Sequence, residues 1–529
     1  MSILSQRVAL LSEQGNQQVT RIFKGIEKES LRVDGSGCLS QQPHPQSLGS
    51  ALTHANITTD YSEALLEFIT QPTEDTQTLL HDLEITQHYT YQNLPQGENL
   101  WLASMPCMLT ADGDIPVAEF GSSNIGKMKT VYRLGLGERY GRSMQTIAGV
   151  HYNFSLGDEF WAFWHKQEGQ DESLQDYKNR RYFDLIRNFR CNFWLLLYLF
   201  GASPAVCRSF VKDREHELQE FGSDSHSLHL SYATSLRMGG LGYQSNAQSS
   251  LVVSYNDLDS YLSTLRCAIT QPHQEYVDSG VFNSDGDYQQ LNTSLLQIEN
   301  EFYSTIRPKR TAGSGETALG ALSNRGVEYI EVRCIDLNPY EPLGVTEEQL
   351  YFIDVFLLYC LLSPSAETND ATFRRELVNQ SLMVSRGRDP KMKLHSEIGQ
   401  QSPQQWGSAL LDVMKLAADV LDRSYDTKRY SDAVIAQKPK LLDASLTPSA
   451  QMLADMKAQD KTFFRLVMDL SQQQAKHFEN KPLNDANKAK FEQQALGSLA
   501  EQGRLEAELQ EPFADFLKAY YRQYGSCGS

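Results

Sequence analysis

The sequence lacks the common signatures of a zinc site or a disulfide scaffold. Its eight cysteines are scattered over 529 residues, with no C-x-x-C pair and no Cys/His cluster at zinc spacing. Scattered cysteines in a long chain are typical of a reducing compartment in which most thiols are buried. We therefore predict a cytoplasmic protein, whose cysteines are Cys38, Cys107, Cys191, Cys207, Cys267, Cys334, Cys360 and Cys527.

Long apolar runs are also missing. The longest, at about residues 193–206, is interrupted by Gly201 and Pro204 and is shorter than the roughly 20 residues of a membrane-spanning helix. We interpret it as a buried helix followed by a turn. The first residues lack the basic-then-apolar layout of a signal peptide. No membrane partner is expected.

Positive charge is scarce. Lys and Arg number 48 against 66 Asp and Glu, which gives a formal net charge of −18 at pH 7. Binding to nucleic acid needs a basic surface, so nucleic acid is not expected as a partner. A small anionic ligand held by a few arginines is compatible with this balance. Hydrophobic residues make up 40% of the chain, enough to bury a large core, and the length suggests two or more domains or one large elaborated one.

Two glycine-rich segments resemble phosphate-binding motifs but fail on detail. Residues 121–128 match G-x-x-x-x-G-K, yet Met128 stands where a P-loop needs Ser or Thr for its Mg²⁺ contact. The segment from Gly135 through Gly137 to Gly141 is not G-x-G-x-x-G, because its last spacing is one residue too long. The sequence also contains no H-E-x-x-H and no G-x-S-x-G.

The order of predicted elements favours an α+β fold. Segments 23–33, 151–156 and 327–335 are rich in aromatic or β-branched residues and are predicted strands. Segments 61–69, 182–200 and 346–362 are predicted helices. These elements alternate irregularly, without the even rhythm of a doubly wound sheet, so we expect a largely antiparallel sheet.

From about residue 366 the chain changes character. Gln, Ala, Lys, Glu and Asp dominate, and apolar residues recur at helical spacing in 451–470 and 487–521. We predict a catalytic sheet-and-helix core over 1–365 and a helix-rich region over 366–529 packed on it. Structural support is the plainest interpretation of that second region. The sequence shows no internal repeat and no long disordered linker.

Glu27 and Glu29 are the most informative pair of residues. In a strand they lie on the same face, where two carboxylates repel each other unless a cation, most simply a metal, lies between them. Surface strands often carry alternating charges, so the pair alone is as compatible with a solvated face. Other acids decide between these interpretations.

The segment that follows Asp60 contains one acid that is hard to explain structurally. Asp60 and Glu63 match a D-x-x-E capping box for the predicted helix 61–69, which accounts for both without any catalysis. Glu67 lies among apolar neighbours about two turns past Asp60, where an acid is usually paired or acts as a ligand.

Two further strands carry polar residues at alternating positions. Glu331 and Arg333 share one face, an arrangement that fits a simple ion pair or a metal ligand beside a phosphate-binding arginine. Glu328 lies on the other face. His151 and Asn153 also share a face, although a single histidine in a strand is more often a buried structural residue than a ligand.

Together these segments resemble glutamate–cysteine ligase, also called γ-glutamylcysteine synthetase, of the proteobacterial type. The resemblance runs continuously from about residue 20 to 345 and is weak past about 365. Its matching stretches are residues 25–33 (GIEKESLRV), 48–54 (LGSALTH), 57–70 (ITTDYSEALLEFIT), 104–107 (SMPC), 144–155 (MQTIAGVHYNFS), 199–204 (LFGASP), 232–237 (YATSLR), 296–301 (LQIENE), 306–310 (IRPKR) and 328–333 (EYIEVR).

The resemblance implies a fold similar to glutamine synthetase, in which a curved, mostly antiparallel sheet forms a funnel with helices outside. It implies that ATP and two or three Mg²⁺ ions, for which Mn²⁺ can substitute, occupy the funnel. The implied reaction joins the γ-carboxylate of L-glutamate to the amino group of L-cysteine through a γ-glutamyl phosphate, with release of ADP and phosphate. This is the first step of glutathione synthesis, and glutathione is implied as a feedback inhibitor of an enzyme expected to be a monomer.

The resemblance also assigns roles to residues of this chain. Arg133 and Arg333, with His151, would be catalytic, and the two arginines would stabilise the phosphoryl group and the oxyanion. Lys309 and Arg310 would lie near ATP. Metal ligands would be Glu27, Glu29, Asp60, Glu67 and Glu331, and substrate-binding residues would be Tyr61, Tyr132, Leu136, Gln145, Arg237, Tyr243 and Tyr303.

One pocket residue departs from the family pattern. The family commonly has Phe where this chain has Tyr61, so a hydroxyl is added that needs a partner or access to water. Two alternatives stay open: a ligase of the same superfamily with a different amine acceptor, and a metal-binding or scaffold protein that has kept the fold without turnover.

Overall fold

A seven-stranded sheet forms the centre of the computed structural model, which describes residues 2–13, 20–169, 171–212, 214–222, 224–242, 248 and 251–527. The strand order is β2-β3-β1-β5-β10-β9, with β4 paired to one end of β1, and every pairing is antiparallel. The strands are β1 (Ile22–Val33), β2 (Ile57–Thr59), β3 (Leu65–Ile69), β4 (Asn99–Trp101), β5 (Val150–Leu156), β9 (Ile306–Lys309) and β10 (Tyr329–Ile335).

The predicted strands 23–33, 151–156 and 327–335 are present as β1, β5 and β10. β1 is long and central, with β3 on one side and β5 on the other, so almost all of it is buried. Alternate residues of β1 therefore face two different layers of the molecule.

Helices α2 (Thr76–Asn93) and α10 (Glu347–Leu362) cover one face of the sheet, which we call the back face. Lys24 of β1 meets Asp354 of α10 there, and Lys28 meets Gln87 of α2. α10 is apolar on nearly all sides because it is enclosed by α5 (Leu174–Asn192), α12 (Pro403–Tyr425) and α13 (Arg429–Leu442). The predicted helix 346–362 is confirmed.

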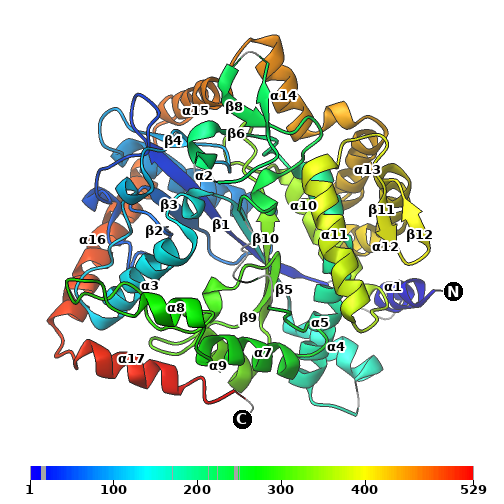
Figure 1. Cartoon of the computed structure of the whole chain (residues 1–529). Helices are drawn as coiled ribbons and strands as arrows, with labels where there is room; N and C mark the ends of the chain where they lie inside the picture. Colours follow the sequence, from blue (N-terminus) through cyan, green and yellow to red (C-terminus); the bar gives the residue numbers. More distant parts are fainter. Residues whose placement is uncertain are drawn as a thin grey trace.

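The opposite face, which we call the front face, holds the candidate site. Helices α3 (Asn124–Tyr140), α7 (Leu258–Thr270), α8 (Gln274–Ser279), α9 (Ala318–Arg325) and α17 (Phe513–Arg522) lie below the sheet in Figure 1. The remaining helices are α1 (Ile3–Glu13), α4 (Asp158–Glu168), α6 (Trp194–Phe200), α11 (Asp370–Arg386), α14 (Pro448–Ala458), α15 (Phe463–Glu479) and α16 (Asp485–Ala507).

Two small sheets complete the fold. One has the order β6-β8-β7, with β6 (Ala205–Cys207), β7 (Gln219–Phe221) and β8 (Asp224–His229). The other pairs β11 (Leu394–Ser396) with β12 (Gly399–Gln401). The apolar run at 193–206 forms the buried helix α6 and then β6.

Several predicted helices are divided in the structure. The segment 182–200 falls in α5 and α6, which meet at Phe193. The segment 451–470 falls in α14 and α15, and 487–521 falls in α16 and α17, with Pro512 just before the second. Proline cannot continue a helix from the preceding turn, which accounts for this last break.

One hydrophobic core extends through residues of both predicted parts of the chain, from Leu4 to Tyr524. The proposed boundary near residue 365 stays a prediction. A disulfide joins Cys267 of α7 to Cys527, so two of the scattered cysteines are paired and Cys527 is fixed beside α7.

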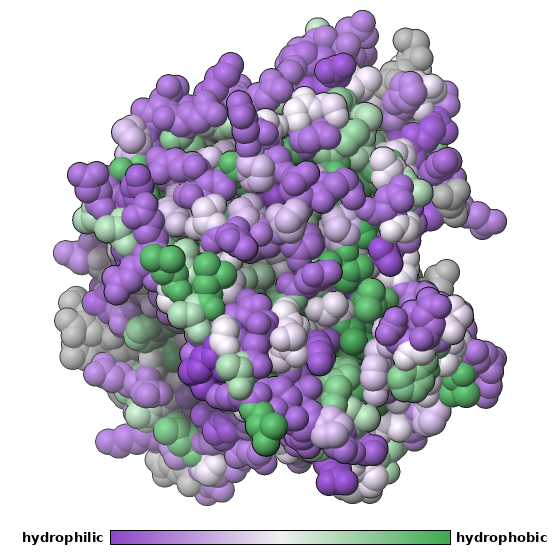
Figure 2. All heavy atoms as spheres, turned by 90° about the vertical axis from the view of Figure 1, so that its left-hand side faces the viewer, coloured by the Kyte–Doolittle hydropathy of each residue, from purple (hydrophilic) through white to green (hydrophobic). Residues whose placement is uncertain are grey.

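The described helices and one face of the surface can be compared with what a membrane span requires. No described helix is long and apolar enough to cross a bilayer. The face drawn in Figure 2 is mostly hydrophilic, with small apolar patches between polar side chains, as is usual for a folded protein.

Candidate active site

The register of the sheet gathers the predicted acids on its front face. Glu29 of β1 lies directly opposite Glu67 of β3, and Glu27 lies opposite His151 of β5. Asn153 of β5 in turn lies opposite Glu331 of β10. Four neighbouring strands thus present one continuous row of acids with a histidine among them.

The segment 61–69 is not a helix, and this prediction was wrong. Residues 65–69 form β3, held on both sides by β1 and β2. The pattern Leu-Leu-Glu-Phe-Ile is compatible with either element, and the two neighbouring strands decide it by supplying backbone partners. Glu63 is therefore not part of a capping box. Its carboxylate accepts from the backbone N–H groups of His44 and Glu119, each at 2.6 Å.

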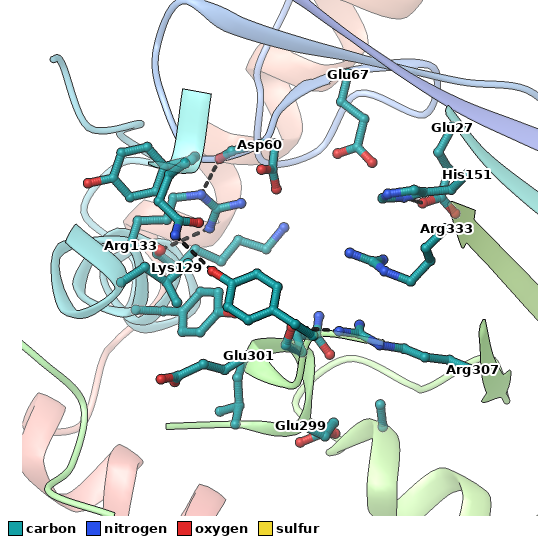
Figure 3. Close-up of a pocket in the computed structure, with 18 of the residues that line it drawn as sticks. Glu27, Asp60, Glu67, Lys129, Arg133, His151, Glu299, Glu301, Arg307 and Arg333 are labelled. Atoms are coloured by element: carbon teal, nitrogen blue, oxygen red, sulfur yellow. Dashed lines mark hydrogen bonds and ion pairs between the residues drawn. The ribbon is translucent and has the colours of Figure 1, made fainter. Parts of the chain in front are cut away.

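The acids face a cavity of about 430 Å³. Figure 3 shows side chains from the sheet, from α3 and from the segment 299–307 pointing into it. The predicted site residues that line it are Glu27, Glu29, Asp60, Tyr61, Glu67, Tyr132, Arg133, Leu136, Gln145, His151, Tyr303, Lys309, Glu331 and Arg333.

Two predicted residues, Arg237 and Arg310, do not line the cavity, and a third is not described. Arg237 is buried behind the cavity wall, where its Nη2 donates to the backbone oxygen of Arg333 at 2.9 Å. Arg310 turns away from the cavity, with its Nε 3.6 Å from a carboxylate oxygen of Glu328. Tyr243 lies outside the described residues.

Glu29 and Glu67 resist ionisation. Burial, and then the charge of Asp60, raises the pKa of Glu29 to about 8. Burial and the neighbouring carboxylates raise the pKa of Glu67 well above its ordinary value. In the described part of the chain, no lysine or arginine lies within 4.0 Å of either carboxylate. A cation bound between them would relieve this repulsion.

Glu27, His151 and Glu331 form a compact cluster, with one ligand atom of each within 4.8 Å of the others. His151 Nδ1 lies 3.4 Å from Glu27, and Asn153 donates to Glu27 at 2.9 Å. Although burial opposes ionisation, the contact with His151 lowers the pKa of Glu27. Burial, then the charge of Arg333, lowers the pKa of His151, so its ring is neutral and can act as a ligand.

Glu331 differs from the other acids because basic groups flank it. Lys309 Nζ lies 3.4 Å from one of its oxygens, and Arg333 Nη1 donates to the other at 3.2 Å. These two cations hold the pKa of Glu331 well below its ordinary value despite burial. The β10 end of the acid row is therefore ionised and lies beside positive charge.

A second group of cations lies across the cavity on α3. Arg133 Nε donates to the backbone oxygen of Asp60, and its guanidinium stacks 4.4 Å from the ring centre of Phe120. Burial, then the charge of Arg133, lowers the pKa of Lys129 to about 8. Figure 3 shows Lys129 and Arg133 on the side of the cavity opposite Arg333. Cations from two elements thus face one space, as binding of a polyphosphate would require.

Comparison with known proteins fits this geometry. The glutamate-cysteine ligase family model matches residues 8–383. Curated glutamate–cysteine ligases from Saccharophagus degradans and Alcanivorax borkumensis are 50% and 48% identical to this chain, covering 99% and 98% of it and 99% and 100% of their own lengths. The chain belongs to the glutamate–cysteine ligase family. The resemblance stated from the sequence is confirmed.

A solved structure of the family also matches the whole fold. Glutamate–cysteine ligase from Francisella tularensis, crystallised in complex with AMP, superposes with a TM-score of 0.90 at 36% identity. The match covers 96% of this chain and 99% of that one. The predicted α+β class, with a mostly antiparallel sheet, is confirmed.

Sequence reasoning missed several lining residues that this ligase fold brings in. Glu299, Glu301 and Arg307 all lie within segments that resembled the family, but no spacing rule singled them out. Arg307 could have been found from β9, because it lies opposite Glu331 in the register. Tyr520 of α17 could not, since nothing in the sequence places the last helix at the cavity.

α17 is held against the site by tyrosine hydroxyls. Tyr521 donates to the backbone oxygen of Gln297 at 2.9 Å, and Tyr524 donates to the carboxylate of Glu299. The far end of the chain therefore supports the segment that forms one wall of the cavity. The helix-rich region contributes to the lining as well as to structural support.

Proposed function

We propose that this chain joins the γ-carboxylate of L-glutamate to the amino group of L-cysteine, with conversion of ATP to ADP and phosphate. Family membership over nearly the full length supports this reaction class. The single observation that carries it to this chain is the row of carboxylates on β3, β1 and β10 facing arginines across one cavity. Transfer of a phosphoryl group to a carboxylate brings two anions together, which such a site can accommodate.

Mg²⁺ is the metal that the donor set fits. The acids Glu27, Glu29, Asp60, Glu67 and Glu331, with His151, would hold two or three Mg²⁺ or Mn²⁺ ions. Hard cations prefer such oxygen donors, and the raised pKa values of Glu29 and Glu67 indicate a site built for added positive charge. When bound, the ions neutralise charge between the phosphates and the substrate carboxylate.

The arginines would act on the reacting groups from opposite sides. Arg333 is held by Glu331 at the sheet, and Arg133 is held by the Asp60 backbone at α3. In our proposal, both stabilise the phosphoryl group as it moves from ATP to the γ-carboxylate. They also stabilise the oxyanion that forms when the cysteine amine attacks the acyl phosphate, and phosphate then leaves. Lys309 would lie on the nucleotide side, whereas Arg310 is less suited because it turns away.

The acceptor would bind where the lining becomes aromatic. Tyr61, Tyr132 and Leu136 present rings and a branched side chain suited to a small polarizable thiol. Gln145 donates to the hydroxyl of Tyr303 at 2.8 Å, which fixes both side chains at this end of the cavity. Arg237 would serve a substrate carboxylate only after giving up its bond to the Arg333 backbone.

An assay of ADP release with omitted substrates tests the reaction. ADP release should require Mg²⁺, glutamate and cysteine together, and should exceed the rate with either amino acid alone. No excess over the single substrates would contradict the proposal. Replacing cysteine by 2-aminobutyrate, alanine or small amines ranks the acceptors, and a strong preference for one of these would indicate a different ligase.

Three further properties belong to the proposal and can be tested with the purified chain. We propose that it acts as a monomer, which sedimentation velocity checks. We propose glutathione as a feedback inhibitor that competes with glutamate, because it carries the same γ-glutamyl group, and inhibition kinetics check this. We propose a cytoplasmic location, where the substrates are made, and fractionation of cells checks it.

A further inference from the structure

The Gly135-Leu136-Gly137 stretch of α3 does not match a phosphate-binding motif, and its glycines need another explanation. Each lies inside a helix, where glycine destabilises by roughly 0.5–1 kcal/mol relative to alanine. Leu136, between them, lines the cavity. Positions two apart on a helix point about 200° away from each other, so the two glycines lie on either side of Leu136.

Gly137 makes room for the hydroxyl of Tyr61. A Cβ atom at position 137 would lie 2.4 Å from that oxygen, closer than real contacts allow, and 3.0 Å from Cγ of Arg142, a tight contact that a small shift of that flexible side chain relieves. The Tyr61 side chain is almost fully buried, and its hydroxyl has no hydrogen-bond partner within the described residues. The hydroxyl is therefore seated against bare helix backbone, and this is the added group that distinguishes Tyr61 from phenylalanine.

Gly135 serves a different neighbour on the other side of Leu136. A Cβ atom there would lie 2.2 Å from Oε1 of Gln297. That side chain cannot move away easily, because it donates to the Tyr132 backbone at 3.0 Å and accepts from the backbone N–H of Leu291 at 2.9 Å. Gln297 therefore contacts α3 at Gly135, and the Tyr61 hydroxyl contacts the same helix at Gly137.

We infer that Gly137 is a specificity-determining position, because it sets how far the Tyr61 ring withdraws from the acceptor end of the cavity. The inference rests on the proposed function, in which Tyr61 and Leu136 contact the acceptor side chain. A methyl group at position 137 would displace the ring, and the cavity is the open space beside it. The acceptor end of the cavity would then become shallower and leave less space for the cysteine side chain.

Gly137→Ala tests this inference. We expect the KM for cysteine to rise at least about tenfold, since crowding by one methylene is worth 10- to 200-fold in such pockets. The KM for ATP should stay within about twofold, and alanine, which lacks the sulfur, should lose less than cysteine. The double variant Tyr61→Phe/Gly137→Ala should return the cysteine KM to that of Tyr61→Phe, because the colliding hydroxyl is gone.

Gly503→Ala is the matched control. Gly503 lies inside α16, and a Cβ atom there meets nothing within 4 Å, so the substitution changes helix propensity without a collision. It should leave all KM values unchanged. An unchanged cysteine KM in Gly137→Ala, failure of Tyr61→Phe to restore it, or an equal rise in the KM for ATP would each overturn the inference.

Tyr61→Phe alone gives a second test that does not depend on folding of Gly137→Ala. Loss of the hydroxyl lets the ring move toward α3, so the rate with L-norvaline relative to L-2-aminobutyrate should rise by about threefold or more. An unchanged ratio would contradict the inference. Failure of the proposed function would look different, because the wild-type chain would then show no cysteine-dependent ADP release at all.

Discussion

The two faces of β1 carry opposite charges, and they differ in whether the fold supplies a counter-ion. On the back face, Lys24 pairs with Asp354 at 2.5 Å. On the front face, Glu27 and Glu29 have a histidine and neutral donors as their nearest partners. One strand of twelve residues thus contains a basic face satisfied within the protein and an acidic face that is not.

This difference separates structural charge from functional charge. A buried ion that has its counter-ion inside the fold contributes to stability, and removing one partner leaves the other unsatisfied. A buried acid that lacks a counter-ion costs stability and is expected where a ligand supplies the missing charge. The ring centres of three tyrosines lie within 6 Å of Lys24, including Tyr425 at 5.8 Å, which reinforces the structural role of the back face.

The largest effect should come from the back face. Lys24→Met leaves Asp354 buried and unpaired, so unfolding in urea should show a loss of about 3–5 kcal/mol. The kcat of the folded variant should stay within about twofold of wild type. Lys24→Met/Asp354→Asn should recover part of the loss, because the unpaired charge is removed. A large fall in kcat with unchanged stability would contradict the assignment of a structural role to Lys24 and the back face.

The front face should show the reverse behaviour. Glu27→Gln keeps the shape and hydrogen bonding of the side chain but removes its charge, and kcat/KM should fall by about 100- to 1,000-fold, or about 3–4 kcal/mol. Thermal stability without metal should not decrease, because a buried charge has been removed. Glu328→Gln is the control: that acid is exposed, lies outside the cavity, and should change activity little. Equal rates in Glu27→Gln and wild type would favour a non-catalytic protein.

The pH dependence of metal binding gives a sharper test of the same face. Because the pKa of Glu29 is about 8 without metal, Mg²⁺ must displace a proton below that pH. Its affinity should rise by up to about tenfold per pH unit between pH 6 and 8. Calorimetry in two buffers of different ionisation enthalpy should detect the released proton, and Glu29→Gln should release less.

In the metal-free protein, the folding stability should change with pH in the opposite direction to the metal affinity. The folded state keeps a proton on Glu29 between pH 4.5 and about 8, whereas the unfolded chain has lost it. The contribution of this group to stability should therefore fall as pH rises through that window, by at most about 1.4 kcal/mol per unit. Melting curves of wild type and Glu29→Gln across this range measure the difference. Parallel curves would contradict the raised pKa.

The smallest effect is expected at Lys28, on the same back face as Lys24. Among the described residues, Lys28 donates to the neutral oxygens of Gln87 and Ser30, and burial lowers its pKa to about 7. Above pH 7 the unfolded chain holds a proton that the folded state lacks, so wild-type stability gains from this group as pH rises toward 10.5. Lys28→Met should remove that gain, and because it leaves the Gln87 and Ser30 oxygens without this donor, it should change stability at pH 8 by about 1–3 kcal/mol. A loss of stability as large as that of Lys24→Met would show that the presence of a charged partner does not explain the different behaviour of Lys24 and Lys28.

Much of the fold could be predicted from the sequence. The strands β1, β5 and β10 and the helix α10 have local patterns strong enough to define them, and tertiary contacts agree with those patterns. The segment 61–69 failed because its pattern suits either element, and only β1 and β2 together make it a strand. The site residues could likewise be predicted where a local pattern defines the element that carries them. Acids on well-defined strands were found, whereas Tyr520 was not, because it reaches the cavity through packing of the last helix.

The sequence by itself determined the family and the two strands that carry Glu27, Glu29 and Glu331, since residue type and spacing decide these locally. The tertiary structure decided which charges belong together. Lys24 and Glu27 are separated by only two residues in the sequence, yet one meets its counter-ion 330 residues away and the other faces a cavity. Alternation along a strand fixes only the face on which a side chain lies. What covers that face, a helix with an acid or an open cavity, depends on contacts between distant segments.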